Sequence, residues 1–89
     1  MASQLSEKAL AMFKAGKYRE TLAVLEQRAT LAPEDQGMGV IRAWSFYHLN
    51  RYDKALELFT ELDRRESTKD TQYGIYYSRR KLDPTHIGE

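Results

Sequence analysis

The chain repeats its own pattern after about 34 residues, a spacing typical of helix-turn-helix repeats. Sliding the sequence by this distance superimposes residues of the same kind: Ala9 on Ala43, Phe13 on Tyr47, Gly16 on Asn50, Tyr18 on Tyr52, Leu22 on Leu56 and Leu25 on Phe59. Small, aromatic and turn-forming positions each coincide, so the match is not random. Because a single unit of this kind cannot bury its apolar face alone, the period predicts stacked helical hairpins.

Residues that start and stop helices divide the chain further. Gly16 and Asn50 both tolerate the left-handed conformation that ends a helix, and each precedes a Lys-Tyr or Arg-Tyr pair that opens the next one. Pro33 cannot donate to a helix ladder, and Ser67 or Asp70 is expected to cap the last helix. The helices predicted on this basis span residues 4 to 15, 18 to 31, 35 to 49, 52 to 66 and 70 to 82.

Apolar side chains recur at intervals of three and four within the second helix of each unit, which places them on one buried face. These stripes are Leu22, Leu25 and Ala29 in the first copy, and Ala55, Leu58, Phe59 and Leu62 in the second. The pattern contains no strand signal of comparable length. The sequence therefore predicts an all-α fold of about five helices, arranged as helical hairpins.

Two blocks of the sequence resemble tetratricopeptide repeats. They are residues 9 to 22, ALAMFKAGKYRETL, and residues 43 to 56, AWSFYHLNRYDKAL. Thr21 departs from the alanine that the family prefers, and Asn50 from its glycine. The resemblance implies an α-α superhelix in a single domain over residues 1–84, with repeats at about 3–34 and 35–68 and the first helix of a third at about 70–82. Residues 85–89 are expected to form a flexible tail.

The resemblance also implies that the first helix of each hairpin lines a concave groove. The matching positions are Ser6, Leu10, Phe13, Val40, Trp44, Tyr47 and His48, extended by Gly74, Ile75, Ser78 and Arg79. The residues expected to contact a partner are Leu10, Phe13, Val40, Trp44, Tyr47, His48 and Arg79. Family members that hold the acidic C-terminus of heat-shock chaperones use lysines and asparagines at such positions. The apolar and aromatic side chains here favour a peptide helix, an extended apolar segment or a sugar ring.

Two aromatic features have both a structural and a functional interpretation. Trp44 is either an anchor for a partner or a plug between the first and second hairpins. Tyr73, Tyr76 and Tyr77 form one ridge at helical spacing. Such a ridge usually belongs to a core, so packing of at least two rings onto the second hairpin is favoured over an exposed docking surface.

Composition and spacing argue against catalysis. The 89 residues include no cysteine and only two histidines, which excludes disulfides, thiolate zinc sites and thiol nucleophiles. Glu57 and Glu61 fit a solvated face flanked by Lys54 and Arg64 better than an acid-base dyad. The sequence therefore predicts no enzyme, no metal and no cofactor.

The charge and the lengths of the apolar runs limit the classes of binding partner. A net charge of +1 gives no field that favours nucleic acid, and no apolar run is long enough for a membrane span or a signal-peptide core. The absence of cysteine is compatible with cytoplasm and periplasm alike.

Two functional hypotheses remain. The leading one is a non-enzymatic protein-interaction scaffold, complete or part of a longer repeat protein, that holds a segment of another protein in its groove. The alternative is a tetratricopeptide segment of a bacterial exopolysaccharide-secretion protein that contacts glycan or its modifying enzymes. Two and a half repeats are fewer than the roughly three needed for independent stability. The shortfall predicts either self-association through the terminal hairpins or excision from a larger protein.

Overall fold

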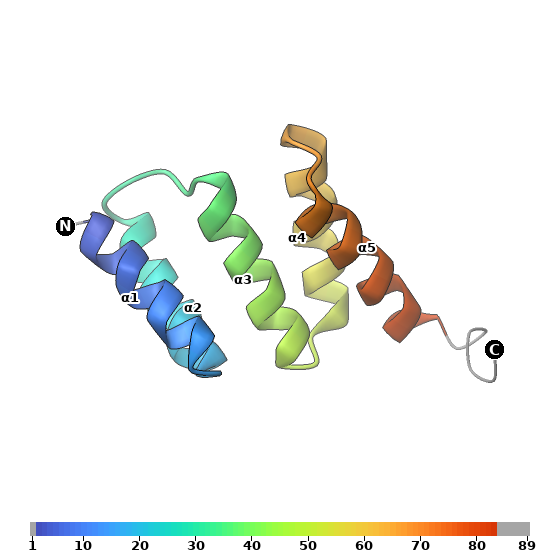
Figure 1. Ribbon diagram of the computed structural model, residues 1–89, viewed down its shortest axis with the longest axis horizontal. Coiled ribbons are helices and arrows are strands. Elements are labelled where there is room, and N and C mark those ends of the chain that lie inside the picture. Colours follow the sequence, from blue (N-terminus) through green and yellow to red (C-terminus); the bar gives the residue numbers. More distant parts are fainter. Residues whose placement is uncertain (1, 84–89) are drawn as a thin grey trace.

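The computed structural model describes residues 2–83, and this part of the chain is all-α. Its five helices are α1 (Ala2–Lys14), α2 (Tyr18–Ala29), α3 (Gln36–His48), α4 (Tyr52–Arg65) and α5 (Lys69–Leu82) (Figure 1). Each overlaps one of the five predicted segments, with ends that differ by two residues or fewer. The all-α prediction is confirmed. The predicted tail at residues 85–89 lies outside the described residues.

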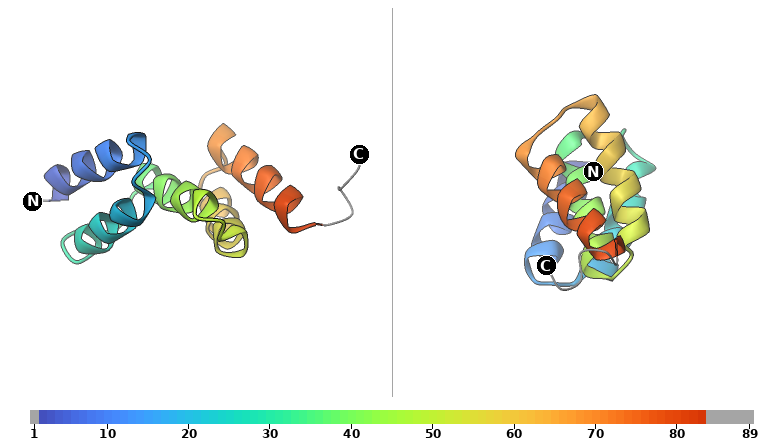
Figure 2. Two further views of the ribbon diagram at one scale, coloured as in Figure 1. Left: turned by 90° about the horizontal axis from the view of Figure 1, so that it is seen from below. Right: turned by 90° about the vertical axis from the view of Figure 1, so that its right-hand side faces the viewer.

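The helices form an elongated body whose principal extents are 47, 26 and 18 Å. α1 and α5 lie toward one side, α2 and α4 toward the other, and α3 runs between them (Figure 2). Among the described helices, α3 alone contacts each of the other four. It therefore joins the two halves of the molecule.

The turns after α1 and α3 have the same backbone geometry. Gly16 and Asn50 adopt left-handed conformations, with φ of 79° and 66°. In each turn the next residue donates its N–H to the carbonyl five positions back, at 2.9 Å in the first turn and 2.8 Å in the second. Such bonds satisfy carbonyls that a helix C-terminus leaves open. The sequence period of about 34 residues thus corresponds to one repeated turn structure.

The first of two apolar clusters lies between α1, α2 and α3. Its buried members are Ala9, Val24, Leu25 and Ile41. Arg28, only 8% exposed, is a buried residue of α2 one turn after Val24 and Leu25. Its guanidinium donates to Ser6 Oγ at 2.6 Å, to the Pro33 carbonyl at 3.1 Å and to Asp35 Oδ2 at 3.3 Å. A single cation therefore links α1, α2 and the segment that leads into α3.

The second cluster lies between α3, α4 and α5. Its buried members are Ala43, Ala55, Phe59 and Leu62. Phe59 is fully buried, and its ring lies against the backbone of Gly74, where a Cβ atom would overlap it. Glycine at this position allows α5 to approach α4 closely enough to enclose the ring.

The tyrosine ridge of α5 faces away from the second cluster, so the prediction that it packs there is wrong. Tyr73, Tyr76 and Tyr77 are 55%, 52% and 43% exposed. The face of α5 that is buried carries small residues instead: Thr71, Gly74 and Ser78. Close approach to the Phe59 ring requires small side chains, so the large rings lie on the outer surface.

The N-terminal cap of α5 also differs from expectation. Thr68 is the capping residue rather than Ser67 or Asp70. Its Oγ1 accepts from the Thr71 N–H at 3.2 Å, and Thr71 Oγ1 accepts from the Thr68 N–H at 2.8 Å. Thr71 Oγ1 donates to Asp63 Oδ1 at 2.7 Å, which ties the cap to the end of α4.

Candidate binding groove

A groove of about 610 Å³ runs along one face of α3. This "α3 groove" is lined by Gln36, Gly37, Val40, Ile41, Trp44 and His48 of α3, by Phe13 of α1, and by Thr68 and Asp70 where α5 begins. The α3 residues recur every three or four positions, so they extend over the full length of the helix. A helix of 13 residues is roughly 20 Å long.

One end of the α3 groove is aromatic. The Trp44 ring meets Phe59 edge to face at 4.7 Å between centroids, and lies 6.3 Å from the His48 ring. The His48 ring stacks on Tyr18 at 4.5 Å between centroids, and Phe13 meets the His48 ring edge to face at 6.3 Å. Desolvation by burial lowers the pKa of His48, which favours its neutral form. This end therefore presents apolar ring surface at neutral pH.

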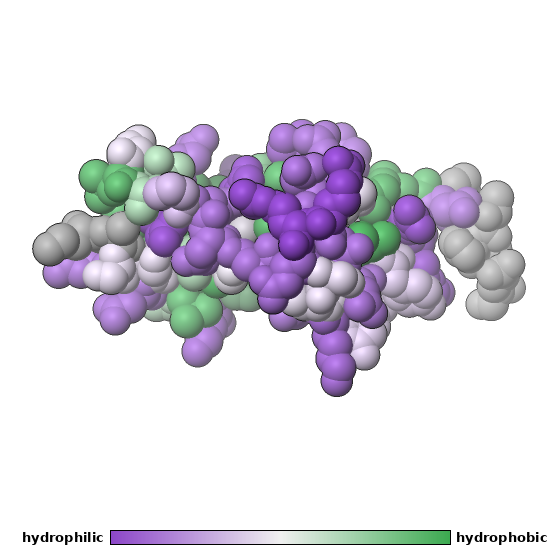
Figure 3. Space-filling view, turned by 90° about the horizontal axis from the view of Figure 1, so that it is seen from above, coloured by the Kyte–Doolittle hydropathy of each residue, from purple (hydrophilic) through white to green (hydrophobic). Residues whose placement is uncertain are grey.

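The opposite end is polar. Gln36 Nε2 donates to the carbonyls of Leu62 and Glu66, at 3.4 and 3.0 Å, which holds the start of α3 beside the end of α4. Thr68 and Asp70 line the same end. Seen from above, hydrophilic side chains gather in the middle of the molecule, over the region where α4 ends and α5 begins (Figure 3).

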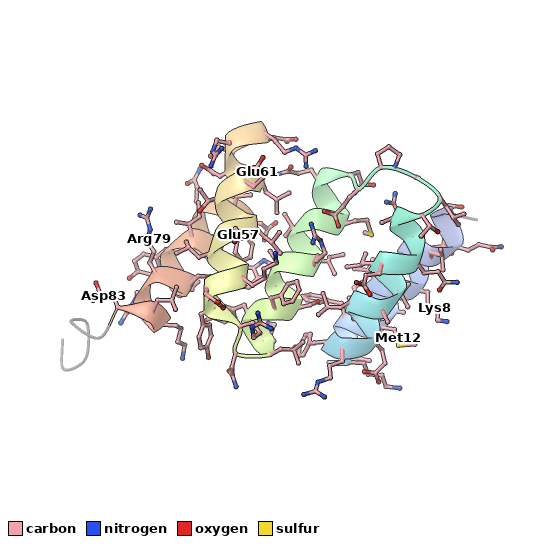
Figure 4. All side chains as sticks on the ribbon, turned by 180° about the vertical axis from the view of Figure 1, so that it is seen from behind. Lys8, Met12, Glu57, Glu61, Arg79 and Asp83 are labelled. Carbon is pink, nitrogen blue, oxygen red and sulfur yellow. The ribbon has the colours of Figure 1, made fainter. Side chains whose placement is uncertain are left out.

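Four residues expected to contact a partner lie together in the α3 groove: Phe13, Val40, Trp44 and His48. Three others do not line it. Leu10 is 38% exposed on α1, and Tyr47 packs edge to face against Tyr52 at 5.2 Å. Arg79 lies near the C-terminal end of α5 (Figure 4).

Several positions that the resemblance assigned to the groove have other surroundings. Ser6 accepts from Arg28. Gly74 and Ser78 are buried on the inner face of α5, and Ile75 packs against the second cluster. Their burial follows from the close packing of α5 on Phe59.

Trp44 combines parts of its two predicted roles. It packs on Phe59 of the neighbouring α4, and it also lines the α3 groove. Its ring is half-buried, so one part stabilises the second cluster and the rest is open to an occupant.

Five lining residues were not predicted: Gln36, Gly37, Ile41, Thr68 and Asp70. Gln36 and Gly37 could have been found by extending the face of Val40 and Trp44 back by one turn. Thr68 and Asp70 depend on where α5 begins in space, and no local sequence signal carries that information.

The acidic pair on α4 belongs to a solvated surface. Glu57 and Glu61 lie on α4 (Figure 4), where they pair with Lys54 at 3.3 Å and Arg64 at 3.4 Å. Their side chains are 71% and 60% exposed. The prediction of a solvated face flanked by these two cations is confirmed.

Within residues 2–83, no three histidine, aspartate or glutamate side chains gather as a metal-ion site. No helix in this range has the length and apolarity to cross a membrane. Comparison of the chain with protein-family models, curated proteins and solved structures finds no match.

Proposed function

We propose that this chain is a non-enzymatic interaction scaffold of the tetratricopeptide type, which holds a segment of a partner protein in the α3 groove. The observation that carries the proposal is the groove itself. It follows the whole of α3, offers ring surface from Trp44 and Phe13, and has a volume of about 610 Å³. Apolar pockets with a few polar groups at the edge are the usual form of a binding site.

The repeated turn supports the assignment to helical-hairpin repeats. The left-handed residues Gly16 and Asn50 lie about 34 positions apart and close the same hydrogen-bonded turn. The alternation of α1 and α5 on one side with α2 and α4 on the other also agrees with a stack of helical hairpins.

Display of short random peptides on phage, selected against the purified chain, tests the proposal. Selected peptides are expected to change the fluorescence of Trp44, because it is the single tryptophan and lines the groove. Gly37→Gln should weaken them, since Gly37 is exposed, lines the groove and has room for a side chain. Ala23→Gln is the matched control, because Ala23 is an exposed residue of α2 that does not line the groove.

Peptides that bind both variants equally well would place the interface elsewhere. If no peptide is selected, while oligosaccharides alter Trp44 fluorescence in the parent chain but not in Gly37→Gln, the glycan-binding alternative replaces the protein scaffold. If neither ligand class binds, the α3 groove is not a binding site.

A further inference from the structure

The two ends of the α3 groove differ in charge as well as in polarity. Of its lining residues, Asp70 is the only one that carries a formal charge at neutral pH, since the lowered pKa of His48 favours the neutral ring. No lysine or arginine lines the groove, and Lys69, next to Asp70, is not among the lining residues. The single charge in the groove is therefore negative, and it lies at the end opposite the rings.

The carboxylate of Asp70 is available to a ligand. It is exposed, and no lysine or arginine within residues 2–83 pairs with it. Asp35, which caps α3 at the same end, is already paired with Arg28. The N-terminus of α5 contributes about half a positive charge, which a full carboxylate charge outweighs. The Asp70 carboxylate is therefore placed to form an ion pair with a cationic group of an occupant.

We propose that the α3 groove holds an extended peptide segment with an aromatic or large apolar side chain on Trp44 and a lysine or arginine beside Asp70. The inference rests on the proposed function and defines its partner. Gln36, at the acidic end, lies eight residues before Trp44 on α3, a rise of roughly 12 Å. An extended chain advances about 3.3 Å per residue. The basic residue is therefore expected about four positions from the aromatic or apolar one.

Sequences of the selected peptides give the first test. They should be enriched in pairs of one aromatic or large apolar residue and one basic residue, about four positions apart. Selected peptides without a basic residue would overturn this inference, although the groove would remain a peptide site. Failure to select any peptide would instead count against the proposed function, so the two failures are distinguishable.

Substitution of Asp70 gives the second test. Asp70→Asn should weaken the best basic peptide by roughly two- to fivefold, the range of an exposed ion pair. Asp53→Asn is the matched control, because Asp53 is also the second residue of a helix and is exposed, but it lies outside the groove. High salt should reduce the difference between Asp70→Asn and the parent chain.

Charge reversal completes the test. Asp70→Lys should prefer a peptide in which the basic residue is replaced by glutamate, while the parent chain prefers the basic form. If Asp70→Lys and the parent chain rank the two peptides identically, Asp70 does not read the charge of the occupant and the inference is wrong. Circular dichroism of each variant checks that the helices are intact.

Discussion

The two halves of the molecule use different means to hold helices together around the shared α3. Between α1, α2 and α3 the buried apolar residues are aliphatic, and a buried cation, Arg28, ties three segments by hydrogen bonds. Between α3, α4 and α5 one ring, Phe59, fills the centre and the backbone of Gly74 closes over it. The first half depends on directional polar contacts, while the second depends on shape.

The two halves should therefore respond differently to substitutions. Hydrogen bonds of Arg28 depend on the orientation of a few atoms, so removing the guanidinium breaks all three of its contacts at once. Packing around Phe59 depends on volume, so both loss and gain of atoms are destabilising. The α3 groove lies across the junction, with Phe13 from the first half and Thr68 from the second.

Truncation of the central ring should have the largest effect. Phe59→Ala removes the fully buried ring between Trp44 and Gly74, and we expect a loss of about 3–5 kcal/mol in the free energy of unfolding. Urea unfolding followed by far-ultraviolet circular dichroism and by Trp44 fluorescence measures it. Leu25→Ala in the first cluster is the comparison. A larger loss for Leu25→Ala would contradict the assignment of the main packing contribution to Phe59.

Removal of the buried cation should have the next largest effect. Arg28→Leu keeps an apolar side chain at this buried position of α2 but removes the donor to the Pro33 carbonyl and Ser6, at an expected cost of about 1–3 kcal/mol. The control is Arg51→Leu, because the Arg51–Asp53 pair is exposed, at 3.8 Å, and contributes little. Equal denaturation midpoints for the two variants would show that the Arg28 contacts do not stabilise the first half.

A single methyl group should test the shape of the second half. Gly74→Ala gains about 1 kcal/mol of helix propensity, but its Cβ atom would overlap the Phe59 ring. Since overpacking typically costs about 1–3 kcal/mol, we expect a net loss of stability. Gly37→Ala is the matched control, because the nearest atom to its Cβ would be Asp35 Oδ1 at 3.6 Å, so it should be neutral or stabilising. Thermal unfolding that ranks Gly74→Ala above Gly37→Ala would contradict the close approach of α5.

Lowering the pH should have the smallest effects on stability, in two steps at different pH values. Desolvation lowers the pKa of His48 in the folded chain, so the unfolded chain binds the proton first as the pH falls. The contribution of His48 to stability is therefore complete above about pH 6.5, the ordinary histidine pKa, and decreases as the pH falls below it. Hydrogen bonds from Thr71 and Ser67 lower the pKa of Asp63, so its contribution is lost only as the pH falls below about 3.9.

Urea midpoints measured across this pH range should show both steps in the parent chain and only one in each of the variants His48→Gln and Asp63→Asn. His48→Gln should remove the step near neutral pH and leave the acidic one. Persistence of the upper step in His48→Gln would mean that another group titrates there.

Some residues of the α3 groove could be anticipated from the sequence, whereas others depend on how the helices pack. The resemblance to tetratricopeptide repeats implied that Phe13, Val40, Trp44 and His48 face a groove, and these four do line it. Leu10 and Tyr47 were also expected there, but they do not line the groove. Leu10 is exposed on α1, and Tyr47 packs against Tyr52 of α4. Helical periodicity gives the direction of a side chain, not the position of the helix that covers it.

The sequence by itself determined the five helices and the two repeated turns, because these follow from local interactions: apolar spacing, the left-handed tolerance of Gly16 and Asn50, and the loss of a donor at Pro33. Only the tertiary structure decided which face of α5 is buried. The tyrosine ridge has the greater apolar area, but Gly74 lets the backbone enclose Phe59, and this contact requires the small face inward. The same placement of α5 brings Asp70 to the end of the α3 groove, where it determines the charge that an occupant meets.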